Sequence, residues 1–353
     1  MSAHPEKTVD ETRQRSRLVL LDAMRSVSIL RVVLIHVFVR FEHPALVPFS
    51  FLAPGMPIVF AVSGALSYAA LSKDGDGDTA RFWRSRARRL LVPFWTYAAF
   101  AVAVLLALDA GMGHAWHAVD HGALWRWALP IVQPMASPSL KALASHLWFV
   151  PPFVFLLATA PLAVALHRRL PWAGLFVFLA ATAVVEFEGL VLPSSLSTTL
   201  YFGIAFQCGF GLTDGSFSKL RPVALLAASL VLLASGVGWH HHVAPGTVVN
   251  SVPLAQILVG LAFLPLWLVG REPVRRAFEG RLLAAASTAV NRRAYTLFLW
   301  GPAATEAAWR IGRHAPASMF LVTYLAAAAI LLFLVAWVFG RVEDHAARRI
   351  RPA

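Results

Sequence analysis

Residues 21–38 read LDAMRSVSILRVVLIHVF. The side chains of this stretch are mostly apolar, and a helix of about 20 such residues is long enough to cross the hydrocarbon layer of a bilayer. It nevertheless holds Asp22, Arg25, Arg31 and His36. Ionisable residues inside a membrane cost about 2.5–3.5 kcal/mol each on insertion scales and usually have a function. The stretch therefore predicts a transmembrane helix that carries part of a functional site.

The composition of the whole chain agrees with a membrane location. Of its 353 residues, 58% are hydrophobic and only 14% are charged, whereas a soluble domain carries about 25% charged residues. The single cysteine, Cys208, excludes a scaffold held by disulfides within the chain. A net charge of +13 on so apolar a chain is more typical of topology signals than of nucleic-acid binding. We therefore expect the lipid bilayer, and no nucleic acid, as a partner.

Apolar segments recur along the chain and predict about ten transmembrane helices. Irregular backbone cannot face lipid, and the sequence shows no alternating pattern of a membrane barrel. The expected fold class is therefore an all-α, polytopic integral membrane protein. The stretch 114–137 is interpreted as a loop or interfacial segment, and Lys73–Thr79 as a flexible turn. The ten segments are 26–42, 50–71, 90–110, 145–166, 171–187, 199–213, 222–239, 250–270, 294–310 and 318–340.

The basic residues predict the orientation of these helices. With the N-terminus inside, most Lys and Arg residues fall in cytoplasmic segments, a positive-inside pattern that places both termini in the cytoplasm. Residues 1–20 are polar and lack the order of a signal peptide. We expect a cytoplasmic tail over 1–20, one transmembrane domain over 21–341 and a basic cytoplasmic tail over 342–353. The exceptions to the pattern are Arg31, Arg40, Arg126, Lys141, Arg310 and Arg313.

Arg25 and His36 are predicted to project from one face of the first helix. Eleven residues separate them, which is only about 20° from three full turns and spans about 16 Å. Asp22, three residues before Arg25, can pair with it. An interhelical hydrogen bond would explain His36 equally well if it stood alone. With Arg25 on the same stripe, the two residues indicate a track for an anionic donor, with Arg25 at the cytoplasmic boundary and His36 near mid-membrane.

The segment RFWRSRARRLLVPFW, residues 81–95, places five arginines just before an apolar span. Two interpretations remain open for this run. A basic cluster at the cytoplasmic end of a span is a common topology anchor. Guanidinium forks also suit phosphate oxygens, and Arg86 and Arg89, about one helical turn apart, could hold the same phosphate group.

Several motifs, taken in order, resemble the membrane acyltransferase-3 family, whose members O-acylate bacterial surface glycans, peptidoglycan and some macrolides. The family's opening segment with its Arg-x(10)-His spacing is matched by LDAMRSVSILRVVLIH, and its phrase like FFVLSGFL by IVFAVSGALS. Its basic Arg-x-x-Arg before a Leu-Leu-Pro-like stretch is matched by Arg86 and Arg89 ahead of LLVP. A helix beginning like HLWFLP is matched at 146–149, and a late phrase like SYTLYLWHPP at 294–302. The matches cover almost the whole chain.

The resemblance implies an enzyme of the bacterial cytoplasmic membrane that transfers acyl groups other than amino-acyl groups. His36 would be the catalytic base, and Arg25, Arg86 and Arg89 would bind the donor. The donor implied is acyl-CoA, by family default acetyl-CoA, as a co-substrate with no bound cofactor. The acceptor would be a hydroxyl of a sugar or other molecule, so that the activity is O-acetylation in polysaccharide modification. Two departures stand out, because Gly301 replaces the family's late His and the segment GMPIVF lacks the Asp of many members.

The chemistry leaves alternatives open. A neutral imidazole, with an unperturbed pKa of about 6.5, can take the acceptor proton directly, or it can form an acyl-His intermediate. A transporter or flippase of a glycan or lipid-linked precursor is the rival from another class, although the halves show no repeat symmetry. A non-catalytic family member is a second rival, which Gly301 makes more plausible.

Other polar residues give weaker signals. His240–His242 are adjacent and cannot all face one ion, so no metal site is predicted. Glu186 could orient an acceptor or simply mark the membrane interface, and Trp148 is typical of a belt anchor. Ser63 and Gly64 are interpreted as a close-packing site that borders the pore, and Cys208 as a small buried hydrophobe. The residues predicted as possible pocket lining are Asp22, Ser63, Trp148, Glu186 and Tyr295.

Overall fold

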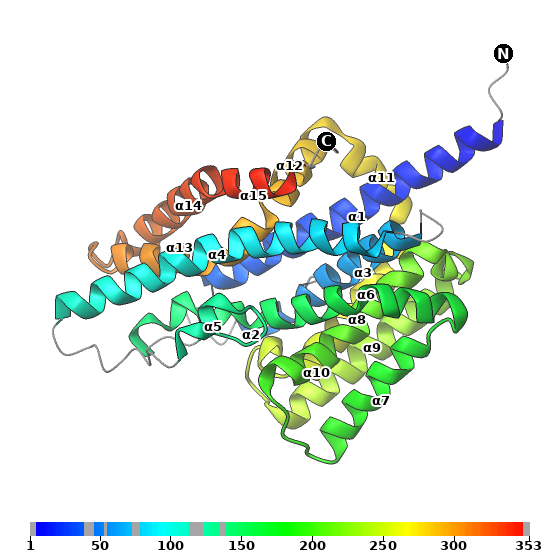
Figure 1. Cartoon of the computed structure of the whole chain (residues 1–353), viewed down its shortest axis with the longest axis horizontal. Helices are drawn as coiled ribbons and strands as arrows, with labels where there is room; N and C mark the ends of the chain where they lie inside the picture. The colour runs from blue at the N-terminus through cyan, green and yellow to red at the C-terminus, as the bar shows by residue number, and fades with distance from the viewer. Residues whose placement is uncertain are drawn as a thin grey trace.

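The computed structural model describes residues 5–38, 46–52, 55–72, 78–112, 123–134 and 138–348 of the chain. Helices make up 86% of the structure, and no strand occurs in these described ranges. The predicted all-α fold class is therefore confirmed. Figure 1 shows long helices that cross one another in two groups, with the N-terminal helix α1 running through the upper part of the molecule.

Each of the ten apolar segments overlaps one of the longer helices. Shorter helices lie between them and at the end of the chain. The ten longer helices are α1 (Pro5–Phe38), α3 (Met56–Ser72), α4 (Thr79–Met112), α6 (Val150–Arg169), α7 (Ala173–Phe187), α8 (Ser194–Asp214), α9 (Pro222–Val243), α10 (Pro253–Val269), α13 (Ala294–Gly312) and α14 (Phe320–Val338). The shorter ones are α2 (Leu46–Ser50), α5 (Trp125–Ala128), α11 (Arg271–Glu279), α12 (Arg281–Arg292) and α15 (Gly340–Ala347), with 3-10 turns at Pro138–Leu143, Ser145–Phe149, Ser216–Lys219 and Val249–Ser251.

Fewer helices meet a strict test for membrane crossing than the sequence pattern predicts. By length and composition four helical stretches in the described ranges qualify: Thr79–Ala107, Lys141–Arg169, Pro222–Val243 and Phe320–Ala347. A fifth qualifies if α10 and α11 count as one span with a 78° bend between them. Because α3 and α7 are apolar but have only 17 and 15 residues, they fall short of a full crossing on their own. Ten spans and two cytoplasmic termini stay predictions.

The core forms where two groups of helices meet. One group contains α3 and α6–α10, and the other contains α1, α4 and α13–α15 (Figure 1). The contact of α3 with α8 is close because Gly64 and Gly209 lie in it: a Cβ on Gly64 would collide with the carbonyl of Phe206, and one on Gly209 with the carbonyl of Ala61. Small residues allow such close approach of helices in membranes. The close-packing interpretation of Gly64 is confirmed.

The boundaries differ from the expected ones in two places. Helix α1 begins at Pro5, so the polar N-terminal tail continues the first helix where the structure describes it. Within 114–137 the described residues 123–134 hold only the four-residue α5, while the rest of that stretch, like 73–77 of the predicted turn, lies outside the described residues. Arg31 of α1 contacts the end of α2, where its Nη2 donates a hydrogen bond of 2.7 Å to the carbonyl of Ser50.

Candidate active site

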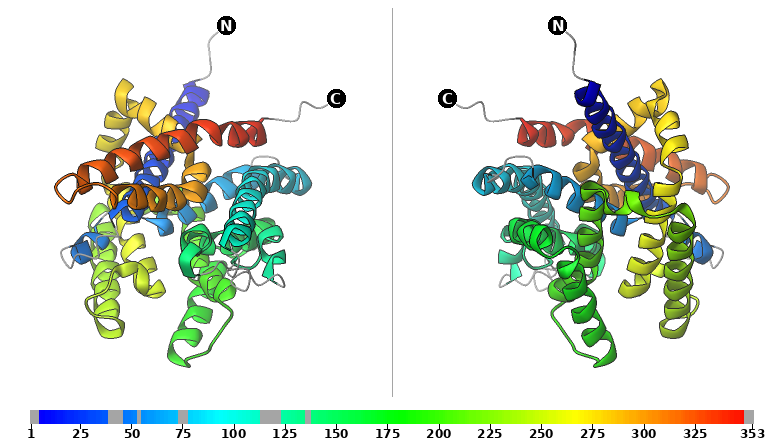
Figure 2. Two further views of the ribbon diagram at one scale, coloured as in Figure 1. Left: turned by 90° about the vertical axis from the view of Figure 1, so that its left-hand side faces the viewer. Right: turned by 90° about the vertical axis from the view of Figure 1, so that its right-hand side faces the viewer.

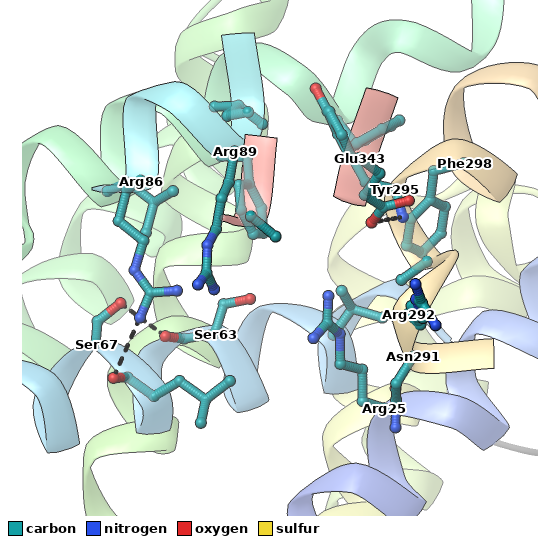
Figure 3. Close-up of a pocket in the computed structure, with 18 of the residues that line it drawn as sticks. Arg25, Ser63, Ser67, Arg86, Arg89, Asn291, Arg292, Tyr295, Phe298 and Glu343 are labelled. Atoms are coloured by element: carbon teal, nitrogen blue, oxygen red, sulfur yellow. Dashed lines mark hydrogen bonds between the residues drawn. The ribbon is translucent and has the colours of Figure 1, made fainter. Parts of the chain in front are cut away.

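A cavity of about 260 Å³ lies where the two helix groups meet. Figure 3 shows arginines of α4 reaching into it from one side and residues of α1, α12, α13 and α15 on the other. Its apolar wall includes Val59, Phe153 and Phe298. The structure brings five residues predicted from the sequence to this cavity: Arg25, Ser63, Arg86, Arg89 and Tyr295.

Helix α4 presents Arg86 and Arg89. Asp78 stabilises the start of this helix, since its carboxylate accepts a hydrogen bond of 2.8 Å from the backbone N–H of Arg81, and the arginine run is therefore helical from its first turn. The guanidinium of Arg86 stands over the ring of Phe82, 5.4 Å from its centroid, and Nη2 of Arg86 lies 3.5 Å from the carbonyl oxygen of Leu66. Neither Arg86 nor Arg89 forms an ion pair with a carboxylate of the described residues.

Arg25 faces these arginines from α1 and is half-buried. The predicted pair with Asp22 is not formed as a direct contact in the described structure: Asp22 is exposed, its charge acts on Arg25 only at longer range, and it does not line the cavity. The backbone carbonyl of Asp22 instead accepts hydrogen bonds from Asn291 Nδ2 at 2.9 Å and Ser287 Oγ at 3.3 Å. These contacts fix α12 against α1 beside the cavity.

Two carboxylates of α15 complete the cavity, and the sequence analysis missed both. Glu343 accepts hydrogen bonds from the backbone N–H groups of Tyr295 and Thr296 at 3.2 and 3.1 Å and from the Thr296 hydroxyl at 2.7 Å. Its charge also attracts that of Arg25. Because a carboxylate is favourable at a helix N-terminus, Glu343 stabilises the start of α13. The available signal was an acidic pair, Glu343 and Asp344, within an otherwise basic terminus.

Asp344 holds the junction between α12 and α13. Its carboxylate accepts hydrogen bonds from Arg292 at 2.8 and 2.9 Å and from Arg293 at 2.9 Å. These bonds raise the pKa of Arg292 above its ordinary value. The carboxylate of Asp344 therefore balances the positive charge of Arg292, although Arg292 also lines the cavity. The three guanidinium groups of Arg25, Arg86 and Arg89 have no direct carboxylate partner in the described ranges. Arg25 and Arg86 are half-buried and Arg89 is exposed, and an unpaired charge becomes costly as it loses contact with water. The cavity is therefore complementary to an anion.

Two further polar atoms lie at the side of the cavity formed by α12 and α13. The Oδ1 atom of Asn291 and the hydroxyl of Tyr295 are buried and find no hydrogen-bond partner among the described residues. Nδ2 of Asn291 is committed to α1, so the orientation of its amide leaves the oxygen as an acceptor. A buried polar atom without a hydrogen-bond partner costs free energy. These two atoms are therefore available to a ligand in the cavity.

His36 lies further along α1 and does not line the cavity. The helical rise places it about 16 Å from Arg25 along the axis. His36 is half-buried, and His146 is its neighbour in the electrostatics of this region. The ring of His146 is buried, with Nε2 at 2.8 Å from the carbonyl oxygen of Leu299 and Nδ1 at 3.1 Å from that of Ala142. In the sequence His146 stands out only as part of a motif, and nothing local shows that it is a neighbour of His36.

The remaining candidates lie elsewhere. Trp148 packs against Phe202, with ring centroids 5.3 Å apart, and does not line the cavity. Glu186 accepts a hydrogen bond from the Tyr201 hydroxyl and borders a separate apolar cavity of about 470 Å³ between α7, α8, α9 and α10. Cys208 also borders that second cavity. A Cβ at Gly301 would meet only Leu332, at 3.7 Å, so a larger side chain at this position is not blocked at its first atom.

The three adjacent histidines, His240–His242, lie in different environments. His240 is buried, and its Nε2 lies 3.2 Å from Thr247 Oγ1 and 3.3 Å from the carbonyl oxygen of Val248. His241 and His242 are exposed at the end of α9. In the part of the chain that the structure describes, no group of three His, Cys, Asp or Glu side chains could hold a metal ion.

Comparison with known proteins identifies the family. The family model described as an acyltransferase domain, Acyl_transf_3, matches residues 18–341. No curated protein and no solved structure matches the chain. The family match covers nearly the whole chain, and its membership implies acyltransferase activity in general. The chain therefore belongs to the acyltransferase-3 family and is, with its long apolar helices, a membrane protein.

Proposed function

We propose that this protein is an O-acyltransferase of the bacterial cytoplasmic membrane, which moves an acyl group, by family default acetyl, from acyl-CoA to a hydroxyl of a glycan or glycosylated metabolite. The observation that carries the proposal is the meeting of Arg25, Arg86 and Arg89 in one cavity. These residues come from helices α1 and α4 and have no direct carboxylate partner in the described ranges. A cavity lined by guanidinium groups without carboxylate partners favours an anionic ligand. Acyl-coenzyme A is an acyl donor that carries phosphates.

The donor's phosphates would bind to the three guanidinium groups. Arginine presents N–H donors in a planar fork that matches phosphate oxygens, and charge-assisted hydrogen bonds are about twice as strong as neutral ones. The apolar wall formed by residues such as Val59 and Phe153 suits the uncharged arm of the coenzyme. The anionic end of the donor would thus remain at Arg25, Arg86 and Arg89 while its thioester extends along α1.

His36 would act as the general base at the thioester. Its neutral imidazole takes the proton of the acceptor hydroxyl while the hydroxyl oxygen attacks the thioester carbonyl carbon. The carbon–sulfur bond then breaks, and the coenzyme thiolate leaves and receives the proton from the imidazolium. A separation of about 16 Å along the helix fits a donor whose phosphates and thioester lie far apart. In the acyl-His variant of this scheme, the imidazole nitrogen itself takes the acyl group before the acceptor arrives.

The test compares purified wild type with the His36→Ala variant in proteoliposomes. Acetyl-CoA and CoA are quantified with a crude extract of surface glycans as the acceptor. General base catalysis contributes about 10²–10⁴-fold, so His36→Ala should lose at least that factor while its melting temperature stays within a few degrees of wild type. Full activity in this variant would contradict the assignment of His36. A wild type that never consumes acetyl-CoA, with or without acceptor, would favour the transporter or the non-catalytic alternative.

Mass spectrometry of cells identifies the acceptor independently. Surface glycans and small secreted metabolites of a deletion strain are compared with those of strains complemented with wild type or with His36→Ala. We expect an acyl mass to disappear from one glycan or metabolite in the deletion strain and to return only with wild type. A loss of the molecule itself, rather than of its acyl group, would point to transport.

A further inference from the structure

Helix α12 exposes apolar side chains on its outer face and turns two polar side chains, Ser287 and Asn291, toward α1. Ser287 is buried against α1, where its hydroxyl lies 3.1 Å from Ser26 Oγ, and Asn291 donates to the carbonyl of Asp22. On the outer side, Leu282 is 82% exposed, and Ala285 and Ala289 are exposed too. A surface helix of a water-soluble domain has the opposite arrangement, with the apolar stripe facing the core.

The exposed apolar residues of α12 form a stripe. Leu282, Ala285 and Ala289 recur at the spacing i, i+3, i+7, which places them on one helical face. Arg281 is exposed at the edge of this stripe and forms no ion pair with a described residue. Arg271, at the start of α11, is also exposed and also forms no ion pair with a described residue. An apolar stripe edged by an unpaired arginine, here Arg281, is typical of a helix that lies in a membrane interface.

Helix α11 provides a contrast in the same region. Its apolar residue Val274 packs against the core. Its outer side carries charges that are paired with one another, because Arg275 forms ion pairs with Glu272 at 2.7 Å and with Glu279 at 2.8 Å. Helix α11 therefore has the ordinary orientation for a helix in contact with water. Val290 of α12 also packs against the core, but the outer face of α12 carries the apolar Leu282 where the outer face of α11 carries paired charges.

The position of α12 agrees with an interface location. The chain turns by 78° between α10 and α11, which together form a candidate broken span, so it leaves the direction of α10 one helix before α12. Figure 2 shows both short helices at the end of the molecule from which the N-terminus projects. The positive-inside pattern assigns this end to the cytoplasmic leaflet, whose anionic lipids attract basic residues.

We propose that α12 lies in the interfacial layer of the bilayer, with Leu282 among the acyl chains and with Arg281 and Arg271 at the phosphates of anionic lipids. Charge complementarity favours lipid over a second copy of the chain, because a twofold contact through this face would bring the same arginines together. The last residues of α12, Asn291 and Arg292, line the arginine cavity. The lipid surface therefore supports one wall of that cavity, whichever reaction takes place there.

The test uses the full chain in vesicles of phosphatidylcholine, with or without phosphatidylglycerol. A nitroxide is attached to Leu282→Cys or, as a matched control on the same helix, to Thr288→Cys, which is exposed but lies nearer the arginine edge. Wild type, whose one cysteine is half-buried in α8, gives the labelling blank. Collision with oxygen, which dissolves in lipid, is compared with collision with a water-soluble nickel chelate. The oxygen-to-nickel ratio should be several-fold higher at 282 than at 288, and higher with phosphatidylglycerol than without it.

Three results would overturn the proposal. Equal access of nickel to both labels would place α12 in water. Dipolar broadening at 282 that disappears on dilution with unlabelled protein would identify a second copy as the occupant. An unchanged ratio at 282 after Arg271→Gln with Arg281→Gln in phosphatidylglycerol vesicles would remove the role of anionic lipid; we expect this double variant to reduce the ratio to its value in phosphatidylcholine alone.

Discussion

Glu343 accepts hydrogen bonds from both the backbone N–H and the hydroxyl of Thr296, a residue 47 positions earlier in the chain. Through these bonds the last described helix, α15, stabilises the N-terminus of α13 at the edge of the arginine cavity. On α4, Arg88 donates a hydrogen bond of 2.8 Å to the carbonyl of His345. Helix α15 therefore connects the two opposite walls of the cavity.

Glu343→Gln is expected to destabilise the protein. The substitution removes a carboxylate from a helix N-terminus, and loss of a cap costs about 0.5–2 kcal/mol. Thr296→Val, which deletes only the hydroxyl contact, should have a smaller effect in the same direction. The measurement is the melting temperature in detergent. If Glu343→Gln combined with Thr296→Val lowers it by the sum of the single effects, the two residues do not act as a pair, because contacting residues show coupling.

Arg86→Ala with Arg89→Ala should raise the KM for acyl-CoA and leave kcat nearly unchanged. Each hydrogen bond to a charged group contributes about 1.5–3 kcal/mol, and 1.4 kcal/mol corresponds to a factor of ten. The double variant should therefore raise KM by at least about 100-fold. Arg84→Ala is the matched control, because Arg84 belongs to the same run but does not line the cavity. A change confined to acceptor kinetics would contradict donor binding by Arg86 and Arg89.

Local patterns in the sequence predicted much of the cavity. Helical periodicity places Arg25 and His36 on one face, and one turn of helix brings Arg86 and Arg89 together; both depend only on residues close in the chain. The family motifs order these helices, and the structure places Arg25, Arg86 and Arg89 around one space. The number of full membrane crossings was harder to predict, because apolar runs as short as α7 have the same composition as a span.

Contacts between distant segments escaped the sequence analysis. Glu343 was assigned to a cytoplasmic tail, because nothing local shows that it meets Thr296 or faces Arg25. His146 lies near His36 only because the turn before α6 packs against the carbonyl of Leu299 on α13. The expected pair of Asp22 with Arg25 satisfied the helical spacing, but the structure leaves the Asp22 side chain exposed while its backbone carbonyl binds α12.

The contact between His167 and Asp214 predicts a pH dependence of stability. Burial raises the pKa of Asp214, but hydrogen bonds from His167, at 2.8 Å, and from Ser216 outweigh it, so the folded-state pKa lies below the ordinary value of 3.8. A depressed carboxyl pKa stabilises the fold above the unfolded-state pKa, and this contribution disappears as pH falls through the folded-state value. Wild type should therefore have a higher melting temperature than Asp214→Asn at neutral pH, and this difference in melting temperature should shrink below about pH 4. A difference that grows on acidification would contradict this sign.

His146 is expected to support the structure around His36 rather than to replace it as the base. A neutral imidazole has one N–H, and the 2.8 Å contact with the Leu299 carbonyl is the shorter of its two. His146→Phe leaves that buried carbonyl without this donor, which costs about 1–3 kcal/mol. His146→Gln retains an N–H donor and should recover most of the lost stability and most of the acyl transfer. Melting curves and acetyl-CoA consumption are measured on both variants. A His146→Gln protein that melts like wild type but transfers no acyl group would place His146 in the reaction beside His36.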